Sequence, residues 1–209
     1  MGCDIHMYVE KKDHQTGRWV KVGNDFLDNW LLEPIVDLLH NWYKVEKKDA
    51  IEIIRNYYND LPPRNKAERH IYKTLDIKVT NDPTHKWWED ASKFGSPKTD
   101  QPYTGRNYTL FGTLAGVRDR SLEMISDIRR GLPDDVSDEV CELSDRWGFD
   151  AHSHNYLTLE ELINNMYYKM SDEELDEYEL GTSFFRNTIN ELKRIGEPKD
   201  VRIVFWFDN

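Results

Sequence analysis

The stretch Cys3-Asp4-Ile5-His6-Met7-Tyr8-Val9-Glu10 alternates between apolar and polar side chains near the start of the chain. Successive side chains of a β-strand point to opposite faces, so this pattern predicts a half-buried strand over residues 3–12. One face of this strand is suited to a core. The other face carries carboxylates, an imidazole and a phenol, and it is therefore the first place to look for chemistry.

Two further stretches show the same alternation. Residues 18–22 follow a turn-like segment at 13–17, so they are expected to form a β-hairpin with the first strand. Residues 200–208 place four large apolar side chains on one face: Val201, Ile203, Phe205 and Phe207. The two ends of the chain are thus expected to supply strands of one sheet.

Helical spacing of apolar residues fills the middle of the chain. Ser137 is a predicted N-cap, and Thr158 with Glu161 and Ser171 with Glu174 form predicted capping boxes. The predicted helices cover residues 25–42, 47–58, 65–75, 107–117, 138–147 and 159–170, and a last one is capped by Ser183 and ends near Gly196. The fold class is therefore α+β, with a small sheet from the N-terminal hairpin and the C-terminal strand packed with several helices.

The 209 residues fit one domain, which we expect to span residues 1–209. Residues 25–100 contain helices and turns without an alternating strand, so they suggest an insertion into that domain. A long loop is expected at 80–103, where Trp87 and Trp88 either stack a ring or pack locally.

Composition excludes several classes of protein. The formal net charge of −11 disfavours binding to a nucleic-acid polymer, because an acidic surface repels phosphate. Two cysteines are too few for a disulfide framework or a zinc ribbon. The absence of a long apolar run or a secretion signal predicts a cytoplasmic protein with no membrane span.

Asp4 and His6 lie two residues apart in the predicted first strand, so they share a face. A carboxylate beside an imidazole suits a divalent Zn, Mn or Fe ion. The same pair also fits a polar strand face on which His6 is hydrogen-bonded to a neighbour.

The segment DAHSHN at 150–155 is a second candidate, expected as an extended loop between two helices. His152 and His154 are two residues apart, and Asp150 has the same parity, which places three potential ligands or catalytic groups within five residues. The alternative is a polar loop whose histidines bond backbone carbonyls.

A complete metal site requires the two candidates to converge in the fold. The predicted ligands are Asp4, His6, His152 and His154. Asp150 or Asp208 would act as a further ligand or would orient an imidazole.

Residues 105–131 contain five arginines but only three acidic residues. The predicted helix start favours anions, and arginine binds phosphate or carboxylate through paired donors. We therefore expect a small anionic ligand, bound by Arg106, Asn107, Tyr108 and Arg118. The alternative is that the arginines form ion pairs within the domain.

Five stretches together resemble a family of uncharacterised bacteriophage and prophage proteins. They are MGCDIH at 1–6, RNY at 106–108 with LAGVR at 114–118, RGLP at 130–133, Trp147 with DAHSH at 150–154, and FWFDN at 205–209. The resemblance does not cover residues 25–100. It implies a viral accessory protein in the host cytoplasm, but it implies no activity and no catalytic roles.

Two functions follow from these candidates. The first is a metal-dependent hydrolase of a small phosphorylated, nucleotide-like molecule, in which the ion generates hydroxide from water. Arg106 and Arg118 would neutralise the phosphate charge, and Asp150 would be a further catalytic group. The second is a non-catalytic protein that sequesters a nucleotide-like signal or a host protein. Either would suit a phage protein that counters host defence.

Overall fold

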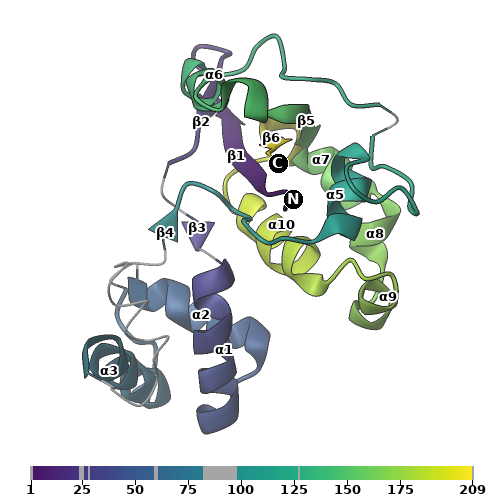
Figure 1. Cartoon of the computed structure of the whole chain (residues 1–209). Helices are drawn as coiled ribbons and strands as arrows, with labels where there is room; N and C mark the ends of the chain where they lie inside the picture. The colour runs from purple at the N-terminus through teal and green to yellow at the C-terminus, as the bar shows by residue number, and fades with distance from the viewer. Residues whose placement is uncertain are drawn as a thin grey trace. The chain divides into compact units, whose positions relative to one another are not determined.

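The structure is a computed structural model that describes residues 2–23, 26–27, 29–58, 61–81, 98–126 and 128–208. Figure 1 shows the elements in chain order. The chain divides into two compact units, Met1–Asn29 with Thr99–Asn209, and Trp30–Lys98. A two-stranded sheet of β3 (Phe26–Leu27) and β4 (Lys98–Thr99) lies where the chain leaves and re-enters the first unit.

The first unit is built on a four-stranded antiparallel sheet in the order β2-β1-β6-β5. Three of these strands were predicted: β1 (Ile5–Lys12), β2 (Trp19–Lys21) and β6 (Val201–Phe207). β1 pairs with β6 from Ile5 opposite Phe207 to Lys11 opposite Val201. The α+β class, with a sheet made by the two ends of the chain, is therefore confirmed.

The fourth strand, β5 (His152–Thr158), contains the histidine segment that the sequence predicted as an extended loop. Its register against β6 shifts between His152 and Asn155, as expected of a β-bulge, and Ser153 has a positive φ of 55°. Asn155 is fully buried and hydrogen-bonds main-chain groups of two other segments. A polar residue in the core and an irregular register together hid this strand from the alternation pattern.

Short helices surround the sheet. They are α5 (Tyr108–Ala115), α6 (Asp138–Asp145), α7 (Leu159–Asn164), α8 (Met166–Lys169), α9 (Asp172–Glu177) and α10 (Ile189–Leu192), with η1 (Gly148–Asp150), η2 (Ser183–Thr188) and η3 (Pro198–Asp200). The predicted N-cap Ser137 is confirmed. The capping boxes that begin at Thr158 and Ser171 are also confirmed.

Two helix predictions were wrong. The single helix predicted over 159–170 is two helices, because Asn165 ends α7 and its side chain caps α8. The last predicted helix begins as the π-helical η2, which has Thr182 and not Ser183 at its N-cap position. It ends as α10 at Leu192, well before Gly196. Gly196 instead permits close packing, since a Cβ there would lie 3.2 Å from Lys11 Cε.

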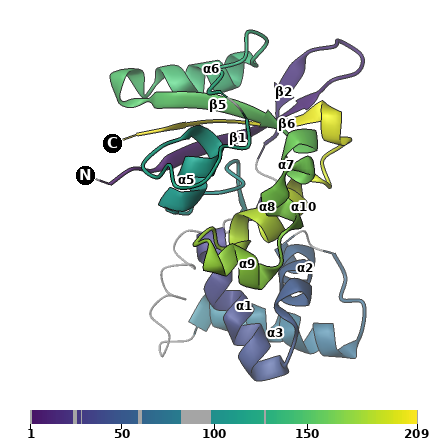
Figure 2. The same ribbon diagram turned by 90° about the vertical axis from the view of Figure 1, so that its right-hand side faces the viewer.

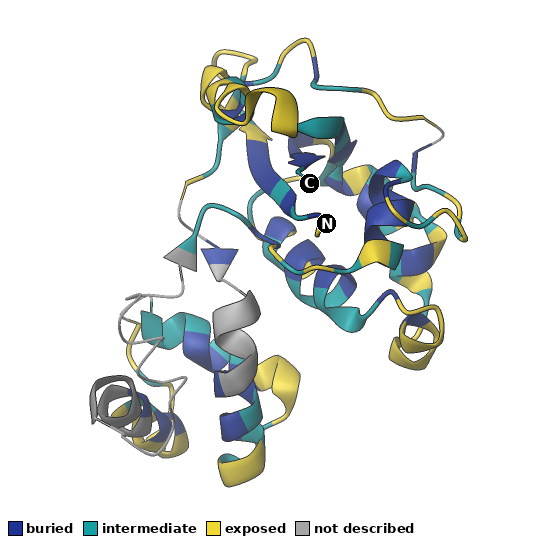
Figure 3. Ribbon diagram, in the orientation of Figure 1, coloured by how far each residue is buried: buried dark blue, intermediate teal, exposed yellow. Residues whose placement is uncertain are grey.

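The two faces of the sheet carry separate apolar clusters. The larger one contains Ile5, Met7 and Val9 of β1 and the odd-numbered side chains of β6, together with side chains of α5, α7 and α10. The smaller one contains Tyr8, Val204 and Trp206 packed with Val140 of α6. Figure 2 shows α6 on one side of the sheet and α5 and α7 on the other, and Figure 3 shows β1 largely buried. The polar ends of β1 and β6 therefore emerge on the α6 side.

The second unit contains α1 (Asn29–Tyr43), α2 (Lys47–Tyr58) and α3 (Lys66–Asn81). α2 has the predicted bounds, whereas α3 continues beyond its predicted end into the expected loop at 80–103. Trp87 and Trp88 lie outside the described residues. No helix in the described ranges is long and apolar enough to cross a bilayer.

Candidate functional site

The start of β1 and the end of β6, the two inner strands, meet at one end of the sheet. Their antiparallel register places Asp4 beside Asp208: the Asp4 N–H donates to Asp208 Oδ1 at 3.0 Å, and the Asp208 N–H donates to the Asp4 carbonyl oxygen at 3.2 Å. We refer to five residues here as the terminal cluster: Asp4, His6, Arg106, Trp147 and Asp208. Strand pairing thus brings the polar groups of both chain ends together.

His6 is held by a carboxylate and by aromatic rings. Its Nε2 lies 3.2 Å from Asp208 Oδ2, and the two side chains are only 13% and 18% exposed. The centroid of its ring lies 4.0 Å from that of Trp147 and 6.0 Å from that of Trp206. Because a carboxylate accepts a hydrogen bond, it favours the tautomer with a proton on Nε2 and a lone pair on Nδ1.

The charge of Asp208 is maintained by its neighbours. Burial by itself would raise the pKa of Asp208, but the bonds from the Asp4 N–H and His6, with the charges of His6 and Arg106, outweigh burial and lower this pKa. Asp208 is therefore ionised at neutral pH. An ionised carboxylate can stabilise an imidazolium that forms on His6.

Arg106 forms a two-pronged ion pair with Asp4. Its Nε and Nη2 donate to the two carboxylate oxygens at 2.8 and 2.7 Å, and both side chains are about half exposed, at 53% and 49%. The hydrogen bonds and the charge of Asp4 raise the pKa of Arg106. Asp4 thus fixes the orientation of a guanidinium at the solvent boundary of the cluster.

The remaining residues of the predicted anion site have different roles. Arg118 Nη2 donates to the Gly2 carbonyl oxygen at 3.2 Å, and its guanidinium lies 5.9 Å from the Tyr108 ring centroid. Asn107 caps α5 and donates to the carbonyls of Glu179 and Leu180. Arg118 and Tyr108 therefore border the N-terminal segment, whereas the side chain of Asn107 is committed to the fold.

The two histidines of β5 lie across β6 from His6. His154 Nε2 is 2.8 Å from Ser144 Oγ, and its ring centroid is 5.8 Å from that of Trp206. His152 Nδ1 is 3.0 Å from Ser153 Oγ. The structure therefore places these imidazoles apart from the Asp208–His6 pair.

The predicted metal ligands do not form one coordination shell as they stand. No group of three or more His, Cys, Asp or Glu side chains in the described part of the chain is arranged to hold a metal ion. Asp150 is exposed at the end of η1. Metal binding by the predicted set, which is Asp4, His6, His152 and His154, stays a prediction, and it requires these side chains to leave their present partners.

Trp147 is the member of the cluster that sequence reasoning did not select as a site residue. It follows α6 and is 37% exposed, so one surface of the indole remains open while it contacts His6. Two signals pointed to it: its place just before the histidine segment, and its presence in one of the five stretches that resemble phage proteins. Contact between residues 6 and 147 depends on tertiary packing, which spacing in the sequence does not encode.

His154 should make the stability of the fold sensitive to pH. Burial, followed by the charge of His152, lowers the pKa of His154 below 6.5. The unfolded chain then binds the proton more tightly than the folded chain, so stability is fully present above pH 6.5 and falls as the pH drops towards the folded pKa. Urea unfolding at several values between about pH 5 and pH 8 measures this effect. The free energy of unfolding of His154→Gln should fall less steeply towards acid pH than that of the wild-type protein. Identical slopes for the two proteins would contradict this.

No family model matches the chain, and no curated protein or solved structure matches it either. The terminal cluster is therefore the basis for a functional proposal.

Proposed function

We propose that the protein hydrolyses a small phosphorylated, nucleotide-like molecule at the terminal cluster. The observation that carries this proposal is the Asp208–His6 pair, packed against Trp147 and placed beside the Asp4–Arg106 pair. A partly buried imidazole oriented by an ionised carboxylate is suited to proton transfer. The Nε and Nη2 of Arg106 already donate to Asp4, so its Nη1 is the group that would donate to a phosphate.

The reactants of the proposed step are water and the phosphate ester. His6 Nδ1 takes a proton from water as the water oxygen attacks phosphorus, and the bond between phosphorus and the leaving oxygen breaks. The proton then passes from His6 to the leaving oxygen, which restores the neutral imidazole. Asp208 stabilises the transient imidazolium, and Arg106 and Arg118 donate to the phosphate oxygens as charge develops there.

The aromatic residues suggest the rest of the substrate. Tyr108 and Trp147 are 39% and 37% exposed, and they adjoin Arg118 and His6 respectively. Exposed aromatic rings can stack on any nucleobase, because every base has a π-face. The resemblance to phage proteins would make a nucleotide signal of host defence a suitable substrate.

Sequestration without chemistry is the second candidate. Phe149 is fully exposed close to Trp147 in the chain, which adds a third accessible ring. Binding by stacking and by Arg106 would need no acid–base group. This alternative predicts a tightly held ligand that leaves unchanged.

A panel of nucleoside monophosphates, diphosphates and triphosphates tests both candidates. Calorimetry measures binding, and chromatography detects product. We expect product from at least one compound, and Arg106→Gln should weaken its binding whereas Arg194→Gln should not. Arg194 is a matched control because it is 51% exposed and paired with Glu191. Binding without product favours sequestration. The absence of both binding and product contradicts both candidates.

A further inference from the structure

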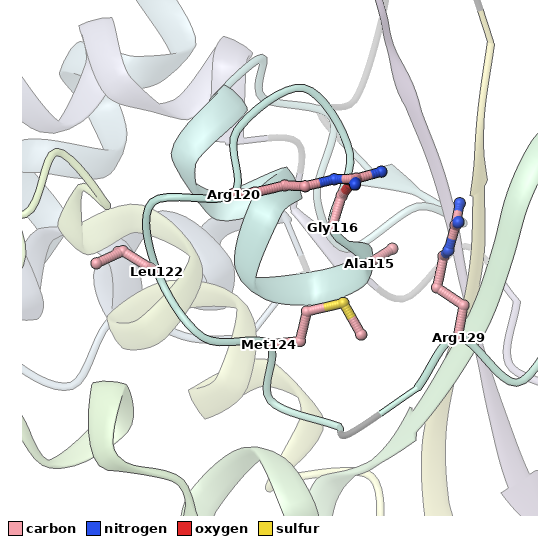
Figure 4. Close-up of a pocket in the computed structure, with 6 residues that line it drawn as sticks. All are labelled: Ala115, Gly116, Arg120, Leu122, Met124 and Arg129. Carbon is pink, nitrogen blue, oxygen red and sulfur yellow. The ribbon is translucent and has the colours of Figure 1, made fainter.

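A separate cavity of about 290 Å³ lies at the C-terminal end of α5. Its lining combines apolar side chains with two guanidinium groups: Ala115, Gly116, Arg120, Leu122, Met124 and Arg129. Figure 4 shows the guanidinium ends of Arg120 and Arg129 on the same side of Met124. The volume is close to the lower limit for small-molecule sites, roughly 300 Å³.

The loop that borders the cavity is held against α5 and α8. The Ile125 N–H donates to the Thr113 carbonyl oxygen at 2.8 Å, and Tyr167 Oη donates to the Glu123 carbonyl oxygen at 2.8 Å. Gly116 ends α5 with a φ of 63°, and a Cβ there would lie 3.0 Å from Met124 Sδ. The apolar floor is therefore preformed and does not depend on a ligand.

Each arginine is positioned by a neutral group. Arg120 Nε donates to the Gly116 carbonyl oxygen at 3.2 Å, and Arg129 Nη1 donates to Ser153 Oγ at 2.7 Å. The bulge of β5 supplies that hydroxyl, which also lies 3.0 Å from His152 Nδ1. Neutral partners orient the guanidinium groups without cancelling their charge.

Neither arginine has a carboxylate partner within the described ranges, although many other arginines of this acidic chain do. Two positive charges thus face one small, partly apolar cavity. An anion placed there would receive charge-assisted hydrogen bonds from both groups.

The geometry points to a second ligand site in this cavity, for a phosphate or carboxylate carried on a compact apolar group. Arg120 and Arg129 bind the anionic group, and Leu122, Met124 and Ala115 contact the apolar part. This site does not rest on the proposed hydrolysis, since it shares no residue with the terminal cluster.

Methyl NMR of the full chain tests the site, with phenyl phosphate, benzoate, inorganic phosphate and benzyl alcohol as probes. Phenyl phosphate or benzoate should shift the Met124 methyl signal and leave that of Met166, which is 56% exposed elsewhere, unchanged. Arg120→Gln and Arg129→Gln should each weaken this response about tenfold, as expected for loss of a hydrogen bond to a charged group. Arg194→Gln and Arg106→Gln should leave it intact, which separates this site from the terminal cluster.

The comparison of probes in the wild-type protein does not depend on any variant folding. Benzyl alcohol has a similar ring without charge, and inorganic phosphate has the charge without the ring, so both should bind at least about tenfold more weakly. The proposal is overturned if benzyl alcohol binds as tightly as phenyl phosphate, if both arginine variants bind phenyl phosphate as tightly as the wild-type protein, or if the Met124 signal does not respond.

Discussion

The His6→Ala variant should hydrolyse its phosphate ester roughly 10²–10⁴-fold more slowly than the wild-type protein, which is the usual contribution of a positioned general base. The loss should appear in kcat, because His6 acts on the water and not on the bound phosphate. Steady-state kinetics with the best compound of the nucleotide panel measures it. Substrate affinity should change less than kcat, since Arg106 keeps its ion pair with Asp4.

His14 offers a matched control for this variant. Its Nε2 lies 3.1 Å from Asp200 Oδ2, so it also forms a histidine–carboxylate pair, but it is 70% exposed in the turn after β1. His14→Ala should retain wild-type turnover. Equal turnover by wild-type protein and His6→Ala would exclude His6 as the base.

The Glu10→Ala variant should lose about 3–5 kcal/mol of unfolding free energy, as is typical when one partner of a buried ion pair is removed. Glu10 and Arg202 are 0% and 3% exposed, and Glu10 Oε2 accepts from Arg202 Nε at 2.7 Å. Glu10 Oε1 also accepts from the Ser137 N–H at 2.7 Å, so it joins the start of α6 to the sheet. Urea unfolding monitored by circular dichroism measures the loss.

Two comparisons identify the cause of that loss. Asp172→Ala removes the carboxylate of an exposed pair with Arg186 and should cost no more than about 1 kcal/mol. Glu10→Leu combined with Arg202→Met should recover much of the stability, since no unpaired charge is then buried. A small effect of Glu10→Ala would show that Asp135, which accepts from Arg202 Nη1 at 2.7 Å, is a sufficient partner.

Local patterns predicted the parts of the fold that depend on neighbours in sequence. The alternation in residues 3–10 and 200–208 predicted β1 and β6, because each strand contributes a row of alternate apolar side chains to the larger cluster. The capping boxes at Thr158 and Ser171 are equally local. The bulge in β5 was missed because buried Asn155 and the irregular Ser153 break the alternation. The π-helical start at Ser183 was missed because it lacks a side-chain cap.

The candidate site was predicted only in part, for the same reason. Shared parity placed Asp4 and His6 on one face, and Asp150 or Asp208 was predicted as a further ligand or as a group that orients an imidazole. The structure places Asp208 beside His6. Trp147 packs on His6, and Arg120 and Arg129 line one cavity. Both arrangements depend on tertiary contacts between residues that are far apart in the sequence. The arginine-rich composition of residues 105–131 predicted an anion site at Arg106 and Arg118, which stays a prediction. It did not point to the cavity lined by Arg120 and Arg129.

Nitrogen-15 NMR of the His6 imidazole, recorded with and without the best nucleotide, tests directly whether this ring is the acid–base group. We predict a neutral ring that is protonated at Nε2. Its Nδ1 resonance should move when the nucleotide is added, and its preference for this tautomer should weaken in Asp208→Asn. A ring protonated at Nδ1, or an Nδ1 resonance indifferent to every nucleotide, would contradict the assignment of His6 as the acid–base group.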